Sequence, residues 1–157
     1  MSQNLKEDIL SSEAQAANVR TRTSKTSTAD PADFDKRIRR ALHAAGEKKA
    51  IDLTVLDLRG VATFTDFFII ATGANKRQMQ AIADEVVEHL KKHGTPAARV
   101  EGYQTAEWIL VDYGDFIVHV FDEKARRFYD LERLWRDAKR LDVSPEQLIE
   151  FSSLKEE

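Results

Sequence analysis

Residues 107–121, EWILVDYGDFIVHVF, constrain the fold of this chain more than any other segment. Two apolar runs rich in β-branched and aromatic residues flank Tyr113-Gly114, a pattern typical of a β-hairpin. Side chains alternate along a strand, so each strand presents two different faces. One face of the predicted hairpin is entirely apolar and must point into the core; it carries Ile109, Val111, Phe116, Val118 and Val120.

The opposite face of the hairpin carries Trp108, Leu110, Ile117 and His119. If residues 113–114 form a two-residue loop, Trp108 pairs with His119 and Leu110 with Ile117, which makes a half-polar outer surface. Alternatively, Gly114 is the left-handed residue of a three-residue loop with a bulge. That register slips by one residue and moves Trp108 to the core side. We expect the first register, although tyrosine is unfavourable where φ is positive.

The remaining sequence predicts a mixed α/β (α+β) domain with a sheet of about five strands. Helix-capping patterns are found at Asp30-Pro31, at Asn75 with Gln78, and at Ser144 with Gln147. Predicted helices cover residues 31–45, 76–93, 123–128, 131–138 and 145–151, and predicted strands cover residues 53–58, 67–70 and 99–103 besides the hairpin. The continuous apolar run at residues 67–70 is typical of a strand that is covered on both faces.

The chain divides into a tail, a domain and a short extension. Residues 1–30 are rich in Ser, Thr, Gln and Ala, with Ile9 and Leu10 as the sole clustered hydrophobes, so we expect a disordered and dispensable tail. Its acidic residues argue against an organelle transit peptide, and we expect a cytoplasmic protein. The folded domain is expected at residues 31–141, followed by an amphipathic helical extension at residues 142–157. No apolar run approaches the roughly 20 residues of a membrane span.

Composition narrows the classes of function. The chain of 157 residues has no cysteine, which excludes a disulfide, a thiolate metal site and a cysteine nucleophile. Its net charge of −3 argues against DNA binding or other broad contacts to a phosphate backbone, which require a basic surface. The expected partners are therefore proteins.

The sequence contains few groups that suggest chemistry. Asp112 and Asp115 could act as paired carboxylates, although acids at a hairpin tip are usually solvated turn residues. His89 and His93 have the spacing of a metal pair, but no third ligand lies nearby, and histidines in a last helical turn complement the helix dipole. The segment 72–75 before a helix lacks the lysine of a phosphate-binding loop. We therefore predict no catalytic residue, no metal and no cofactor.

An aromatic and aliphatic group near acidic residues is the most prominent candidate for binding. Trp108 and Leu110 come from the hairpin, and Phe128, Tyr129 and Trp135 follow it. Tryptophan and tyrosine are the residue types that anchor protein interfaces. The alternative is that these side chains simply fill the core.

Five segments, in this order, carry a resemblance to a known family: VLDLRG, TDFFIIATG, RQMQAIAD, DYGDFIVHVF and RRFYDLERLW. Over residues 47–137 the chain resembles the ribosomal silencing factor family (RsfS, also called Iojap-like). The resemblance implies a fold similar to the nucleotidyltransferase fold without its catalytic signature. It also implies a non-enzymatic translation repressor that binds ribosomal protein number fourteen of the large ribosomal subunit and blocks joining of the small subunit.

We predict that nine residues bind the partner: Trp108, Leu110, Asp112, Tyr113, Asp115, His119, Arg127, Tyr129 and Trp135. The alternative function is a nucleotidyltransferase-like or metal-dependent enzyme that uses Asp112 and Asp115. The sequence does not decide between a monomer and a homodimer. The resemblance extends neither to residues 1–30 nor to residues 142–157.

Overall fold

The computed structural model describes residues 5–11 and 28–152. Six strands form one sheet: β1 (Ile51–Asp57), β2 (Phe67–Thr72), β3 (Arg99–Glu101), β4 (Trp108–Asp112), β5 (Phe116–Phe121) and β6 (Lys139–Asp142). The helices are α1 (Leu5–Leu10), the 3-10 turn η1 (Pro31–Asp33), α3 (Lys36–Glu47), α4 (Lys76–Lys92), α5 (Glu123–Tyr129), α6 (Leu131–Leu134) and α7 (Pro145–Ser152). Within the described part of the chain, no helix is both long and apolar enough to cross a membrane.

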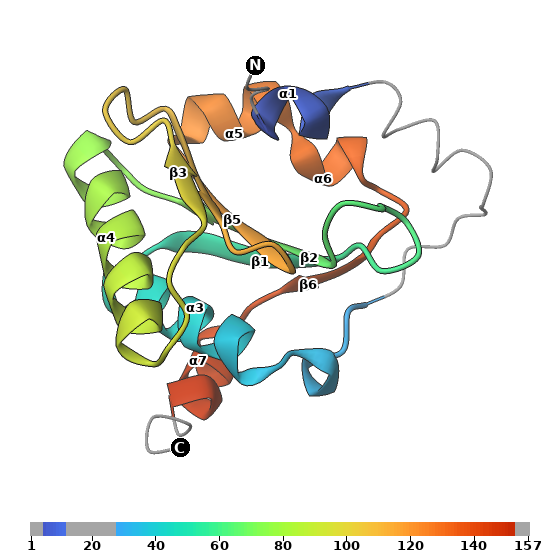
Figure 1. Ribbon diagram of the computed structural model, residues 1–157, viewed down its shortest axis with the longest axis horizontal. Coiled ribbons are helices and arrows are strands. Elements are labelled where there is room, and N and C mark those ends of the chain that lie inside the picture. The colour runs from blue at the N-terminus through green and yellow to red at the C-terminus, as the bar shows by residue number, and fades with distance from the viewer. Residues whose placement is uncertain (1–4, 12–27, 153–157) are drawn as a thin grey trace.

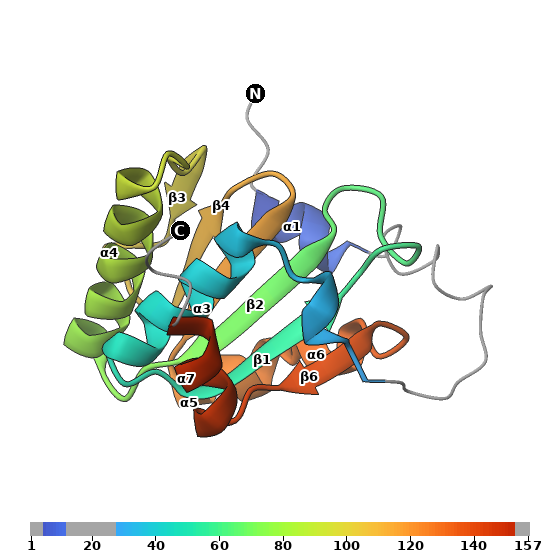
Figure 2. The ribbon, with the colours of Figure 1, turned by 90° about the horizontal axis from the view of Figure 1, so that it is seen from below.

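The sheet is mixed and lies between two helical layers. Its strand order is β3-β4-β5-β2-β1-β6, with β2 and β5 parallel and all other neighbours antiparallel. Helices α3, α4 and α7 cover one face, and α1, α5 and α6 cover the other (Figures 1 and 2). The prediction of a mixed α/β domain is confirmed, and the sheet has six strands where about five were predicted.

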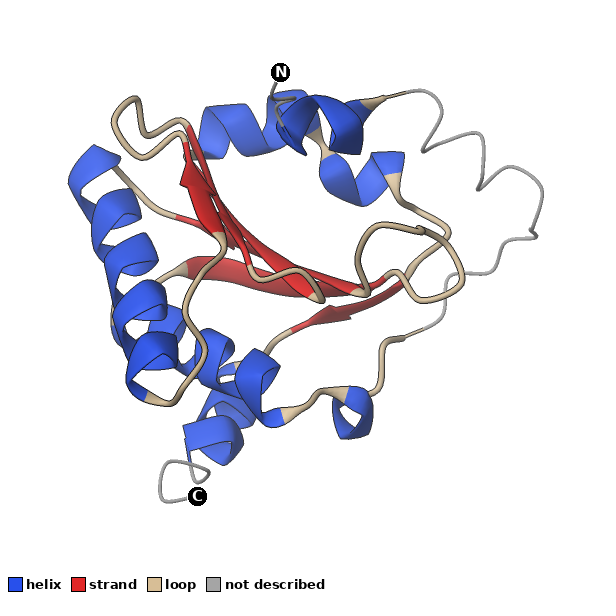
Figure 3. Cartoon of the chain, in the orientation of Figure 1, coloured by secondary structure: helices blue, strands red, loops and turns tan. Residues whose placement is uncertain are grey.

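The strand that the sequence did not reveal is β6, which pairs with β1 at an edge of the sheet. Its sequence, KRLD, has one hydrophobic residue, so it shows no apolar run. Sequence reasoning placed a helix up to Ala138, but α6 ends at Leu134. Figure 3 shows β6 as the outer strand next to β1. Charged residues suit such an edge because they discourage pairing with other chains.

The hairpin forms with its loop one residue further along than predicted. Tyr113 N–H donates to Phe116 O at 3.0 Å, so the two loop residues are Gly114 and Asp115. Gly114 adopts φ +84°, so the loop residue with positive φ is a glycine and not Tyr113. Trp108 therefore pairs with Phe121, and not with His119. The pairing partner of each residue is thus shifted by two positions. A shift by two leaves every side chain on the face that the expected register gave it.

The predicted outer face of the hairpin is not a surface, and this expectation is wrong. Trp108 is 4% exposed, and Leu110 and His119 are fully buried. They belong to a second core, together with Phe68 and Trp135, that lies under α1, α5 and α6. The other face, as predicted, packs Ile109, Val111, Phe116, Val118 and Val120 into the core beneath α3 and α4. The sheet is thus covered on both sides.

Helix α4 begins and ends where the sequence predicts. The Asn75 side chain accepts a hydrogen bond from Gln78 N–H at 2.8 Å. In the reverse direction, the Gln78 side chain accepts one from Ala74 N–H at 2.6 Å. The chain leaves the helix at Gly94, where φ is +92°. Helix α7 is capped in a similar way. The Ser144 side chain accepts from Gln147 N–H, and the Gln147 side chain accepts from Ser144 N–H.

The first helix of the domain starts later than expected. Asp30 and Pro31 begin only the 3-10 turn η1, and Asp35 caps α3 by accepting from Arg37 N–H and Ile38 N–H. Gly46 lies inside α3 and not after it. Its missing Cβ leaves room for Leu148, because a Cβ there would lie 3.0 Å from the Leu148 side chain.

The expectation of a disordered tail is wrong for the parts of residues 1–30 that the structure describes. Helix α1 buries Ile9 completely, and Ala29 is also fully buried. Thr28 forms a bridge to Arg140 beside β6. Residues 1–4 and 12–27 lie outside the described residues, as do residues 153–157 of the predicted extension.

Because Trp108 is in the core, Trp108→Ala is expected to lower the free energy of unfolding by about 3 to 5 kcal/mol. Phe128→Ala is the control, because that ring is 77% exposed and its loss should change stability little. Urea denaturation of both variants measures the difference. A Trp108→Ala protein that unfolds at the wild-type urea concentration would contradict the burial of this side chain.

Candidate functional site

A continuous row of aromatic rings crosses the second core and reaches the surface at α5. It runs from the buried Trp135 through Phe68, His119 and Trp108 to Tyr129. Phe128 stands on the outer end of this row, with its ring centroid 4.9 Å from that of Tyr129. Its 77% exposure makes it the most exposed of the large hydrophobic residues that the structure describes.

Phe128 lies near the C-terminal end of α5, a helix of seven residues. Asp122 caps the helix by accepting from Ala125 N–H at 2.7 Å, and the chain ends it at Asp130 with φ +47°. Ala125 faces the core, and Phe128 comes three residues later at the rim of a hollow of about 270 Å³. Acidic and basic side chains complete this rim, which is lined by Glu107, Asp122, Lys124, Ala125, Phe128 and Tyr129. An exposed ring backed by buried rings is suited to anchoring a protein partner.

His119 lies in the middle of the row of aromatic rings, and its imidazole is neutral. Trp108 Nε1–H donates to His119 Nδ1 at 3.0 Å, so the ring proton is on Nε2. Burial lowers the pKa of His119 to about 3, and the nearby Lys6 ammonium acts in the same direction. The Nε2 atom is buried without a hydrogen-bond partner in the described part of the chain. His119 was predicted to bind the partner, but it has no exposed surface.

The structure does not bring the nine predicted partner-binding residues together. Asp112, Tyr113 and Asp115 lie at the hairpin tip, and Trp108 lies at the other end of β4, about 13 Å away along the strand. Tyr129 lies beside Trp108, with ring centroids 4.6 Å apart. The partner-binding role of all nine stays a prediction.

Each residue at the hairpin tip already has partners within the chain. Asp112 accepts from Gly114 N–H at 2.8 Å and lies 3.5 Å from Arg99. Asp115 pairs with Arg37 at 2.8 Å, which ties the tip to α3. Burial raises the pKa of Tyr113 to about 12, and its ring stacks on Phe116.

The other predicted residues differ sharply in exposure. Leu110 and Trp135 are fully buried, so neither presents surface to a partner. Arg127 is exposed on α5 and pairs with Glu123 at 3.1 Å. Surface pairs of this kind contribute little to stability, so Arg127 remains available to a partner.

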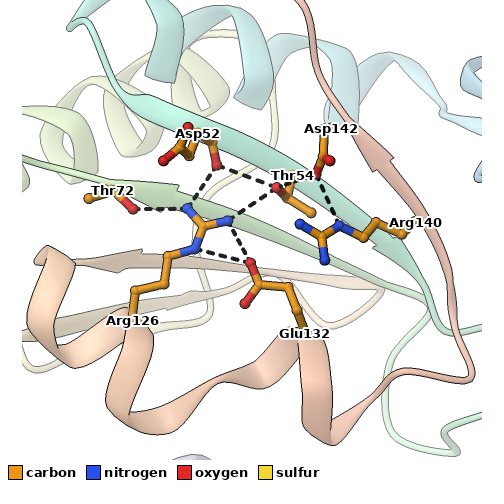
Figure 4. Close-up of polar contacts among 7 residues, drawn as sticks. All are labelled: Asp52, Thr54, Thr72, Arg126, Glu132, Arg140 and Asp142. Atoms are coloured by element: carbon orange, nitrogen blue, oxygen red, sulfur yellow. Dashed lines mark hydrogen bonds and ion pairs between the residues drawn. The ribbon is translucent and has the colours of Figure 1, made fainter.

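A second feature is a polar hollow of about 570 Å³ between α5, α6 and the β1–β6 edge of the sheet. Figure 4 shows the Arg126 guanidinium pointing toward Asp52, Thr54, Thr72 and Glu132. Its guanidinium donates to Glu132 Oε2 at 2.6 and 3.0 Å, to Asp52 O at 2.7 Å, and to the hydroxyls of Thr72 and Thr54 at 2.9 and 3.1 Å. All five donors of the group are used. Arg126 therefore acts as a tie between helices and sheet, with no donor left for a phosphate.

The backbone of β1 is shaped to receive this tie. The β1–β2 pairing shifts register between Ile51 and Thr54, and Asp52 adopts φ +51° at the shift. A bulge leaves backbone groups outside the ladder, and here the freed Asp52 carbonyl accepts from Arg126. The sequence analysis missed this role, because Arg126 lies among charged residues and looks like part of a solvated face.

The described residues contain no group of three or more His, Cys, Asp or Glu side chains arranged to hold a metal ion. His89 and His93 lie close together, with ring centroids 4.7 Å apart, and His43 lies 5.6 Å from His89. His93 Nδ1 is 2.9 Å from His89 O, so this nitrogen is engaged within the helix. Burial, together with the neighbouring His93 and His43, lowers the pKa of His89.

The structure is a small mixed α/β domain with an exposed aromatic ring on α5, and the comparisons with known proteins give its family. The family model "Ribosomal silencing factor during starvation" matches residues 31–156. The chain belongs to the ribosomal silencing factor (RsfS) family, as its resemblance over residues 47–137 indicated.

Relatives and solved structures agree with this assignment. Ribosomal silencing factor RsfS of Halalkalibacterium halodurans is 40% identical over 103 residues, which cover 66% of this chain and 88% of that protein. The mouse protein "Mitochondrial assembly of ribosomal large subunit protein 1" is 30% identical over 92 residues, covering 57% of this chain and 40% of that one. A crystal structure from Chromobacterium violaceum matches with a TM-score of 0.64 and 34% identity, covering 69% of this chain and 91% of that one.

The buried His119 predicts acid sensitivity. Its pKa is near 3 in the folded protein and about 6.5 when unfolded, so the unfolded state binds more protons between these values. Stability should therefore fall as the pH drops below about 6.5, by about 2 kcal/mol at pH 5 relative to pH 7. Urea denaturation at both pH values measures this for the wild type and for His119→Gln, whose amide oxygen can still accept from Trp108. An equally steep loss in the variant would contradict the assignment to His119.

Removing the tie at Arg126 should destabilise the fold. Arg126→Ala leaves Glu132 and the Asp52 carbonyl without their donor in a site where both charged side chains are 13% exposed. We expect a loss of about 2 to 3 kcal/mol. The neighbouring Arg127→Ala is the matched control and should melt like the wild type, because its side chain is 71% exposed. Equal melting temperatures for the two variants would show that the tie contributes nothing.

Proposed function

We propose that the protein silences translation by binding the large ribosomal subunit, chiefly through its ribosomal protein number fourteen, and by blocking joining of the small subunit in the cytoplasm. The family membership carries this proposal. The name of the mouse relative, which refers to assembly of the ribosomal large subunit, supports the same subunit. Such a mechanism is steric and needs affinity, not turnover.

The surface at α5 supports a protein partner of basic character. Phe128 supplies an exposed aromatic anchor, and Tyr129 and Trp108 support it from below. Acidic side chains of Glu107 and Asp122 line the same rim. The net charge of −3 favours encounter with a basic protein, and ribosomal proteins are basic because they bind RNA.

No observation favours the alternative of a nucleotidyltransferase-like or metal-dependent enzyme. Asp112 and Asp115, its candidate residues, are engaged with the Gly114 amide, Arg99 and Arg37. Arg126, one of the arginines that line the larger hollow, has all five donors occupied. Occlusion by a stoichiometric binder remains the function that we propose.

Sucrose-gradient sedimentation of purified subunits with added protein tests the proposal. We expect joined ribosomes to shift to free subunits, with the protein in the large-subunit fractions. Phe128→Ala removes the exposed anchor and should weaken large-subunit binding by about thirtyfold, equivalent to about 2 kcal/mol.

Ile149→Ala is the matched control for this experiment, because Ile149 is also an exposed hydrophobic residue, at 71%, but lies on α7 in the other helical layer. It should bind like the wild type. Joined ribosomes that persist at saturating protein, or sedimentation with the small subunit, would contradict the proposed function. Wild-type affinity in Phe128→Ala would remove α5 from the interface.

A further inference from the structure

Helix α1 covers the aromatic end of the second core. Ile9 is fully buried in that core, with Leu5 and Leu10 packed against it. Lys6 lies over the Trp108 ring, with Nζ 4.9 Å from the ring centroid. Leu5 N–H is 3.3 Å from Glu101 Oε2. Figures 1 and 2 show α1 on the same side of the sheet as α5.

This cover lies outside the residues that the family model matches. The family model begins at residue 31, so it includes β4 and α5 but not α1. The solved Chromobacterium violaceum structure is matched over 91% of its length by 69% of this chain. A helix of six residues is also too short to be stable in water by itself. Helix α1 therefore depends on its docking contacts for its helical shape.

Below α1 lies a site for a cation. Strand β3 ends at Glu101, and the chain turns away at Gly102 with φ +78°, which leaves the Trp108 carbonyl to accept a hydrogen bond from a side chain. Lys6 Nζ donates to this carbonyl at 2.6 Å. A Cβ at position 102 would collide with both the Trp108 carbonyl and the Lys6 amine, so only glycine keeps the site open.

Two carboxylates beside the site offset part of the cost of burying a positive charge there. Burial lowers the pKa of Lys6, whereas the carboxylates of Glu101 and Glu107 oppose that shift. Glu101 Oε1 is buried and has no hydrogen-bond partner within the described residues, so the site has a further acceptor for a cation. The ring of Trp108 adds a cation–π contact. Next to this site lies the apolar surface that the Ile9 side chain covers.

We propose that the surface beneath α1 is a docking site for the partner and that α1 is a built-in competitor for it. The chemistry of the site selects a short protein segment that presents a lysine or arginine beside an aliphatic side chain, as α1 does with Lys6 and Ile9. The carboxylates of Glu101 and Glu107 disfavour RNA, whose phosphates they would repel. The inference rests on the proposed function, in which the partner is a basic protein of the large subunit.

Competition within the chain weakens the apparent affinity by a known rule. The measured Kd is the intrinsic Kd divided by the fraction of molecules with the site open. If α1 leaves about a tenth of the molecules open, binding is weakened about tenfold. Removing the competitor should restore the intrinsic affinity.

The test uses the full chain with Trp135→Phe, which leaves Trp108 as the sole tryptophan. Trp135 Nε1 has no hydrogen-bond partner in the described part of the chain, so this change breaks no hydrogen bond there. In this background, Ile9→Glu is expected to displace α1, to increase acrylamide quenching of Trp108 several-fold, and to tighten binding to purified large subunits about tenfold. Glu7→Gln is the control on the exposed side of α1 and should change neither quantity.

Two further measurements guard against a folding defect. Deletion of residues 1–11 should reproduce both effects of Ile9→Glu, and melting temperatures show that each variant is folded at the assay temperature. A synthetic peptide of residues 1–11 should compete with large subunits for the deletion variant, and the same peptide with Lys6→Met should compete less well.

Two results would overturn the inference alone. One is wild-type quenching of Trp108 in both the Ile9→Glu and the deletion variant, which would show that α1 does not cover the site. The other is an exposed Trp108 with unchanged affinity for the large subunit, which would show that α1 and the partner do not compete. A failure of every form to bind large subunits would instead overturn the proposed function, and this inference with it.

Discussion

Strands β2 and β5 pair in parallel at the centre of the sheet, and every residue of both is buried. Parallel pairing requires a crossover connection, and both faces of such a pair must be shielded from water. Helices α3, α4 and α7 shield one face, and α1, α5 and α6 shield the other. The two helical layers therefore meet the need to cover this central pair.

Covering the second face with short helices requires polar ties as well as apolar packing. Helices α5 and α6 comprise seven and four residues, so neither is stable by itself. Arg126 joins α5 to Glu132 just inside α6 and to the bulged edge of β1. By holding α5 in place, this tie also fixes the position of Phe128, the solvent-exposed ring at the outer end of the aromatic row. Packing and the candidate binding surface are thus parts of one arrangement.

The chemistry of that surface fits a binding module. Its aromatic rings are stacked on a rigid sheet, which reduces the conformational entropy lost when a partner binds. Its charged groups are mainly carboxylates near the start of β4, where Lys6 now lies. A surface of this kind has an apolar anchor and a cation site side by side. The two elements together give specificity that neither gives alone.

The sequence by itself determined which side chains share a face and where most helices begin. Alternation along the hairpin correctly separated Val118 from Trp108, and capping residues such as Asn75 and Ser144 marked helix starts, because both signals are local. Only the tertiary structure decided that Trp108 is covered, because its cover, Ile9, lies about a hundred residues away and has no periodic pattern. The same holds for β6 and for the tie at Arg126, since a polar edge strand and a half-buried arginine depend on partners distant in the chain.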